Sequence, residues 1–150
     1  MTKYIDDLEW QDQVNSLRKG GVARKIIVFD GAAHKGLQAS VINLFTVTGD
    51  VRVRVNAKCA TSLDSTGAPT LEIGIAGGTA TIIAQTTAKN IDVDMFWNDA
   101  TPGTIQADAS KFLAADDIIG TVGSANIDSG QLTFYCEWEA LSLDGNVVAS

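Results

Sequence analysis

The chain has 150 residues and a formal net charge of −7 at pH 7, with a sequence pI near 4.5. The length suits one domain with a full hydrophobic core and is short for two. The acidic balance argues against nonspecific nucleic-acid binding, which needs a basic surface, so no nucleic-acid partner is expected.

The low share of charged residues and the small number of cysteines limit the kinds of protein that fit this composition. Charged residues are 19% of the chain, against about a quarter in typical domains, which favours surface buried between subunits. Cys59 and Cys136 are too few for a disulfide scaffold and are expected to be reduced and buried. We find no secretory signal and no apolar run near the roughly 20 residues that cross a membrane. We therefore expect no membrane partner and a protein made in a cytoplasm and kept there or released by lysis.

The first 21 residues differ from the rest. Acidic residues come early, and Arg18 and Lys19 come late, just before Gly20-Gly21, an order that suits a helix dipole and a glycine stop. Residues 1–21 are predicted to form an N-terminal arm, and residues 22–150 the β domain. The arm is a short helix on its own domain, a segment that docks on a neighbour, or a segment that orders only on binding. Its apolar side chains form an imperfect helical stripe and are its expected partner-binding residues: Tyr4, Ile5, Leu8, Trp10, Val14 and Leu17.

From Val22 onward the pattern is that of β-strands separated by turns. A first strand is expected at residues 23–29, followed by a loop at residues 30–38. Two apolar runs within residues 41–59 flank Thr48-Gly49-Asp50, a turn signal that predicts a β-hairpin. The second run alternates strictly, which predicts a strand with one buried face. Its inward residues are Val51, Val53, Val55, Ala57 and Cys59, and its outward residues are Arg52, Arg54, Asn56 and Lys58.

The second half of the chain continues the same pattern. Gly77-Gly78 predicts the turn of a hairpin over residues 71–86, and residues 90–103 are interpreted as a short strand and a long loop. Later strands are expected at residues 104–107, 111–114, 118–122 and 131–140, before a turn at Asp144-Gly145-Asn146. About eight strands with turns every 8–12 residues or so predict an all-β fold, a jelly-roll-like antiparallel β-sandwich.

Charge placement suggests which strands pair. In residues 131–140, Glu137 and Glu139 point outward, as do Arg52, Arg54 and Lys58 in the earlier strand. Side by side, these strands would form cross-strand ion pairs. Their inward faces would then bring Cys59 and Cys136 into one core layer.

The chain carries no recognisable catalytic arrangement. His34 is its only histidine and stands in a loop without a nucleophile motif. The glycines of residues 74–78 superficially suggest a phosphate loop but lack its lysine and helix. Asp92, Asp94 and Asp99 could offer oxygens to calcium, yet their spacing is not that of an EF-hand. We therefore expect no enzyme, no catalytic residue, no cofactor and no metal site.

Three segments resemble small virion structural proteins of tailed bacteriophages: residues 44–55 (LFTVTGDVRVRV), 71–102 and 118–149. The resemblance implies a non-enzymatic particle component, and within that class a capsid decoration (cement) protein. Such proteins are compact β-rich domains, often trimeric, seated on the outer shell, and they commonly use a terminal arm. The implied partners are the major capsid protein and further copies of the chain, with a trimer favoured. The implied location is the head surface of the virion, after synthesis in the host cytoplasm.

Two other functions stay open on the sequence. A tail, baseplate or fibre component would present a β-sandwich for host-surface glycan binding, with the loop of residues 90–103 and Trp97 as the contact region. A carbohydrate-binding or hydrolytic sandwich would act on the host envelope through paired carboxylates.

Overall fold

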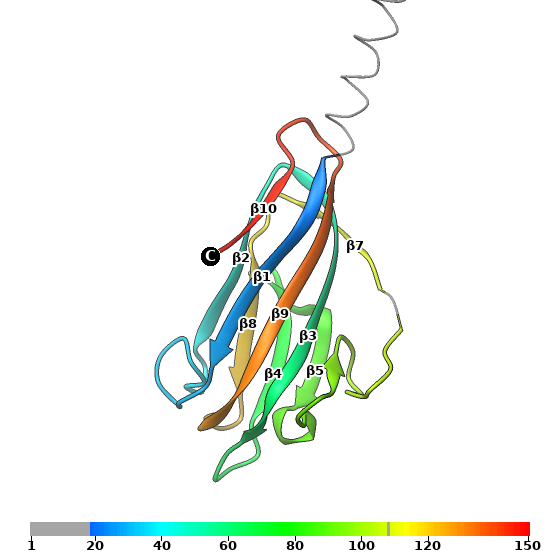
Figure 1. Cartoon of the computed structure of the whole chain (residues 1–150). Coiled ribbons are helices and arrows are strands. Elements are labelled where there is room, and N and C mark those ends of the chain that lie inside the picture. The colour runs from blue at the N-terminus through cyan, green and yellow to red at the C-terminus, as the bar shows by residue number, and fades with distance from the viewer. Residues whose placement is uncertain (1–18, 108) are drawn as a thin grey trace, which may run out of the picture.

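Two antiparallel β-sheets pack face to face in the computed structural model, which describes residues 19–107 and 109–150 (Figure 1). The predicted β-sandwich is confirmed, with ten strands where about eight were expected. One short 3-10 helix, η1, spans Ala88–Asn90. In this part of the chain, no helix has the length and apolar character needed to cross a membrane. The strands are β1 (Gly20–Val28), β2 (Val41–Thr48), β3 (Asp50–Asp64), β4 (Thr70–Ile75), β5 (Gly78–Thr87), β6 (Phe96–Trp97), β7 (Lys111–Ala114), β8 (Ile118–Gly123), β9 (Ser129–Ala140) and β10 (Asn146–Ala149).

The strand order is that of a jelly roll. The first sheet runs β1-β9-β3, and both β6 and β7 pair with the far edge of β3. The second sheet runs β10-β2-β8-β4-β5. Most successive strands therefore alternate between the sheets, which is the double Greek-key arrangement of jelly rolls. In the described chain β1, β5 and β10 are edge strands, each paired with one neighbour.

The hairpin predicted over residues 41–59 is wrong, because β2 and β3 belong to different sheets. The chain instead turns a corner at Gly49, whose φ is +62°. The corner is held from the C-terminal region, since Asp50 N donates to Ser142 Oγ (2.9 Å) and Leu141 N donates to Asp50 O (2.8 Å). Both strands bury one face, as predicted, but they bury it against each other across the core.

The other predicted elements have mixed outcomes. The hairpin at Gly77-Gly78 is confirmed as β4 and β5, and residues 111–114, 118–122 and 131–140 form β7, β8 and β9. The strand predicted at residues 104–107 is wrong, because that segment is a loop. A side chain, and not a neighbouring strand, binds the carbonyl of Ala107: Asn98 Nδ2 donates to Ala107 O at 2.6 Å.

Trp97 lies at the centre of the core and is fully buried. Its ring meets Phe134 edge to face, with centroids 6.3 Å apart, and its Nε1 donates to the Thr86 hydroxyl at 2.9 Å. The prediction that Trp97 belongs to an exposed contact loop is therefore wrong. The two-residue strand β6 pairs Trp97 with Ala57, which turns the indole inward.

Both cysteines are free and buried on the inner face of the first sheet, as predicted. Burial raises the pKa of Cys136 to about 12, with a smaller contribution from the Glu137 carboxylate. Burial, and secondarily the Asp92 carboxylate, raises the pKa of Cys59 to about 11. Since the thiolate is the nucleophile, we expect neither thiol to react with Ellman's reagent at pH 8. Both should react after unfolding in guanidinium. Rapid labelling of the folded protein would contradict this.

Candidate interaction surfaces

The predicted arm residues cannot be placed on any surface. Tyr4, Ile5, Leu8, Trp10, Val14 and Leu17 lie outside the described residues. The last part of the predicted arm lies within the described residues, where Gly20 and Gly21 are the first residues of β1. They pair with Glu139 and Trp138 of β9, so β1 begins two residues before the expected boundary at residue 22.

The outward side of the first sheet combines cationic and apolar side chains, and we call it the arginine face. Arg52 lies opposite Glu139 and Arg54 opposite Glu137 in the β3–β9 register, so the predicted ion pairing of these strands is confirmed. The Arg54 Nη2 to Glu137 Oε2 distance is 3.0 Å. The charged side chains of this face are Arg24, Asp50, Arg52, Arg54, Lys58, Glu137 and Glu139. Cations outnumber carboxylates here, although the whole chain is acidic.

Two of the cations on this face stack on aromatic rings. Lys58 Nζ lies 4.4 Å from the centroid of Phe96 and also donates to Asp94 O, where an ion pair with glutamate had been predicted. The Arg24 guanidinium lies 5.7 Å from the centroid of Tyr135. The ion-paired side chains are nearly half exposed, so each pair adds only about 0–1 kcal/mol to stability.

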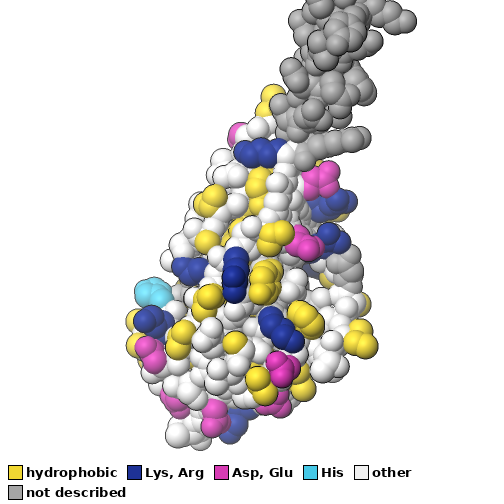
Figure 2. Space-filling model, viewed as in Figure 1, with side chains coloured by type: hydrophobic (Ala, Val, Ile, Leu, Met, Phe, Trp, Pro, Cys, Tyr) yellow, Lys and Arg dark blue, Asp and Glu magenta, His cyan; other side chains and the backbone are white. Residues whose placement is uncertain are grey.

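Large apolar side chains stand between these charges, as Figure 2 shows for this side of the molecule. Phe112 is 73% exposed and Val22 is 62% exposed. Single exposed apolar residues are ordinary, whereas a group of them beside arginines is typical of interfaces. The exposed apolar residues of the arginine face are Val22, Ile26, Val28, Phe96 and Phe112.

The opposite face of the sandwich is chemically different. The five strands of the second sheet, all within the described residues, contain a single charged residue, Glu72. Its outward positions are mostly small or neutral polar, such as Asn43, Thr46 and Thr121. The two faces of the molecule therefore suit different partners, and the arginine face has the composition of a protein-binding surface.

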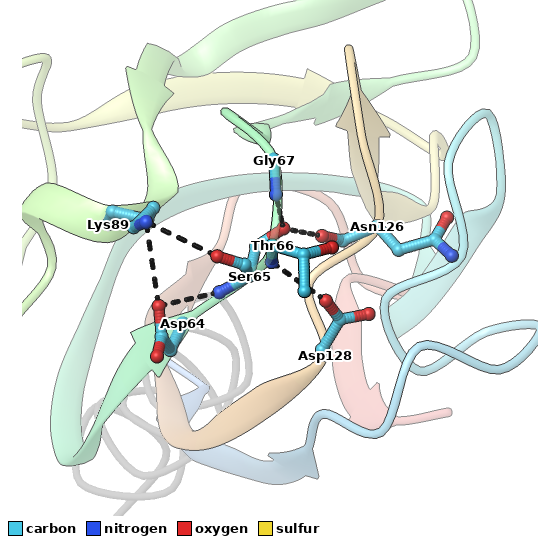
Figure 3. Close-up of polar contacts among 7 residues, drawn as sticks. All are labelled: Asp64, Ser65, Thr66, Gly67, Lys89, Asn126 and Asp128. Atoms are coloured by element: carbon cyan, nitrogen blue, oxygen red, sulfur yellow. Dashed lines mark hydrogen bonds and ion pairs between the residues drawn. The ribbon is translucent and has the colours of Figure 1, made fainter.

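A polar cluster ties together the loops at the end of the sandwich where β3 leads to β4 and β8 leads to β9 (Figure 3). Ser65 Oγ donates to Asn126 O (2.6 Å), and Thr66 N donates to Asp128 Oδ2 (3.1 Å). Asp64 Oδ1 accepts from Ser65 N (2.8 Å) and lies 3.6 Å from Lys89 Nζ. The carboxylates thus satisfy backbone N–H groups, and we interpret the cluster as a structural clasp between loops.

The candidates for metal binding and catalysis do not converge. Across residues 19–107 and 109–150, no three His, Cys, Asp or Glu side chains are grouped so that they could hold a metal ion. Asp99 Oδ1 accepts from Thr101 N (2.7 Å), a turn contact within its own loop. His34 is exposed, and its Nδ1 lies 2.7 Å from Val41 O.

No protein-family model matches the chain, and no curated protein matches it. One solved structure is similar enough to show a shared fold. A chain of the "Acidic stable capsid structure of Helicobacter pylori bacteriophage KHP30" is similar, with a TM-score of 0.53 and 12% identity, over 87% of this chain and 94% of that chain. A chain of the "Cyanophage Pam1 capsid asymmetric unit" has a TM-score of 0.42 and 12% identity, over 82% of this chain and 86% of that one. The second score is too low to support an argument, and the first supports a shared fold only.

Proposed function

We propose that this protein is a non-enzymatic structural component of a bacteriophage capsid, and specifically a decoration (cement) protein that binds the head shell and stabilises it. The observation that carries the proposal is the shared fold with a chain of a phage capsid structure, which extends over 94% of that chain. The resemblance of three sequence segments to virion structural proteins supports it. Jelly rolls also recur in viral capsid proteins.

In this proposal the arginine face contacts the major capsid protein at the head surface of the virion. Its exposed Phe112 and Val22 supply apolar area, and its cations supply charge complementarity to an acidic site on the shell. The N-terminal arm, residues 1–21, holds the shell or a neighbouring copy through Tyr4, Ile5, Leu8, Trp10, Val14 and Leu17.

The proposed mechanism is mechanical. A decoration protein that binds only the assembled shell stabilises that shell by mass action, because binding favours the assembled state. A homotrimer, which we favour, would present three arms and three arginine faces at once, so that modest contacts add up through avidity. Closed cyclic symmetry would also account for the low charge density, since each subunit buries surface on two neighbours.

Arg52→Glu tests the docking surface. It removes an ion pair with Glu139 and places a further carboxylate on the arginine face, so we expect about tenfold weaker binding to heads. Lys89→Glu is the control, because it changes the net charge equally but lies in the loop cluster. The measurement is co-sedimentation with heads of the parent phage that lack this protein. Equal binding by both variants would reject the arginine face as the docking surface, and absence of binding by the unchanged protein would reject the proposed function.

The tail or fibre alternative loses its main support, and no observation favours the hydrolytic one. Glycan binding through residues 90–103 depended on an exposed indole, whereas Trp97 is fully buried. We therefore propose neither.

A further inference from the structure

The sandwich is open along one side, between β1 and β2. A groove of about 500 Å³ lies there, and we call it the β1–β2 groove. Its floor consists of core residues, Ile27 and Ile42, which are 6% and 2% exposed. Strand β10 covers only residues 45–48 of β2, so the remainder of this edge of β2 opens onto the groove. The lining residues used below are Lys25, Ile26, Val28, His34, Lys35 and Ser150.

The β1 wall of the groove presents unpaired backbone. Phe29 N donates to Gly130 O and Ala140 N donates to Lys19 O, so the odd-numbered residues of β1 face β9. Because hydrogen-bonded residues alternate in an antiparallel pair, the N–H and C=O groups of Ile26 and Val28 point away from β9. They have no hydrogen-bond partner among residues 19–107 and 109–150. This edge is therefore free to accept another strand.

The β2 wall is occupied in part, at the carbonyls of Val41 and Leu44. Val41 O lies 2.7 Å from the Nδ1 atom of His34, and Leu44 O accepts from Ser150 N at 3.0 Å. An incoming strand would therefore pair with β1 and lie over the apolar floor.

The chemistry of the groove predicts an acidic occupant with apolar residues. Its lining residues include Lys25, Lys35 and His34 and no Asp or Glu side chain; Lys35 Nζ lies 4.0 Å from Asp30 Oδ2, and Lys25 Nζ donates to the carbonyl of Ser150. Ile26 and Val28 line it while remaining 48% and 55% exposed. A peptide that matches must carry negative charge and large apolar side chains.

The segment that precedes β1 has this composition. Residues 1–18 include four carboxylate side chains and two cationic ones. In an extended chain, Leu8, Trp10 and Val14 fall on one side, together with Asp12. Asp7, Glu9, Gln11 and Gln13 fall on the other. Eighteen extended residues reach up to about 60 Å, ample for a neighbouring subunit.

A second copy is the better source of this segment than the chain itself. The arm joins β1 at Gly20, at the end farthest from the groove. To fold back along the free edge it would pass beside Lys25, whose Nζ donates to the carbonyl of Ser150 next to β10. The C-terminal strand therefore stands in the path of the chain's own arm.

We infer that the β1–β2 groove binds the N-terminal segment of a second copy, which adds as a strand to the free edge of β1. Leu8, Trp10 and Val14 would face the floor at Ile27 and Ile42. The other side would lie beside Arg24, Ile26 and Val28, which share the outward face of β1. Such a contact is heterologous, with arm on one copy and groove on the next, so it closes into a ring when the rotation allows. The inference concerns contacts between copies and does not depend on the head shell.

Disulfide trapping between two full-length variants tests this. Glu9→Cys and Val28→Cys proteins, whose side chains would share the outward face, are purified separately, one with a size tag, then mixed and oxidised. The heterodimer is measured on non-reducing gels. Docking places the two thiols at a millimolar effective concentration, so we expect cross-linking on the order of tenfold faster than for Glu9→Cys mixed with Ala84→Cys. Ala84 is an exposed residue of β5, on the opposite edge, and serves as the matched control.

Three outcomes would overturn the inference. Equal rates with the Val28 and Ala84 partners would show that the arm has no preference for the groove. Faster homodimer formation by Val28→Cys alone would indicate that two β1 edges pair directly. In a variant that carries both Glu9→Cys and Val28→Cys, an intramolecular disulfide without dimer would assign the groove to the chain's own arm. Head binding is measured separately, so failure here leaves the proposed function standing.

Discussion

Replacing Trp97 with alanine is expected to lower the free energy of unfolding by about 3–5 kcal/mol. The indole is fully buried against Phe134, so its loss leaves a cavity that the two sheets cannot close without shifting. The substitution also leaves the Thr86 hydroxyl, itself 2% exposed, without the N–H that it accepts. Urea unfolding followed by circular dichroism would measure the change in free energy. In thermal unfolding we expect a midpoint lower by about 10 °C or more.

Phe96→Ala is the matched control for this prediction. Phe96 is the other residue of β6, but its ring lies on the arginine face and is 38% exposed. Its loss removes a contact with Lys58 without opening the core, so the expected cost is about 1 kcal/mol or less. Equal destabilisation by the two variants would contradict the assignment of Trp97 to the centre of the core.

Gly36→Ala is expected to destabilise the protein by about 3 kcal/mol. Gly36 has a φ of +118°, in a region that side chains rarely adopt. A Cβ at this position would also lie well inside van der Waals contact with Ile127 O. The same glycine accepts a hydrogen bond from Ile127 N at 2.8 Å, so the loop cannot move away without losing that bond. Chemical unfolding of the purified variant gives the free energy directly.

Gly77→Ala provides the comparison. Gly77 stands in the exposed β4–β5 turn, and no atom lies within 4 Å of a Cβ built there. Its φ is not in the positive region, so we expect a change within about 0.5 kcal/mol. If the two alanine variants were equally stable, the close approach of Gly36 to Ile127 would not be a determinant of the fold.

Strand faces were predictable from the sequence, whereas strand partners mostly were not. The alternation in residues 51–59 correctly placed Val53 inward and Arg52 outward, because a period of two is a local property. The turn at Thr48-Gly49-Asp50 has the same composition whether the chain returns within one sheet or crosses to the other. Only the arginines and glutamates identified a non-local pair, β3 with β9, since opposite charges specify a neighbour.

The candidate surfaces were harder to predict from the sequence than the strand faces. Trp97 was misplaced because a two-residue strand inside a loop has no periodicity to read. The arginine face could be anticipated in part from Arg52, Arg54, Glu137 and Glu139. The β1–β2 groove could not, because it depends on how far β10 extends along β2 and on which edge of β1 meets β9.

The alternation of strands between the sheets also has a kinetic consequence. Apart from the β4–β5 hairpin, the main ladders join distant segments, and β1 pairs only with β9, which is made more than one hundred residues later. Such non-local topologies fold over about milliseconds to seconds, because loop-closure entropy must be overcome before the contacts form. During synthesis β1 stays unpaired until β9 has left the ribosome. The segment that precedes β1 is therefore attached to a folded strand only near the end of folding. Docking of this segment in the groove of a second copy is delayed until each domain is complete.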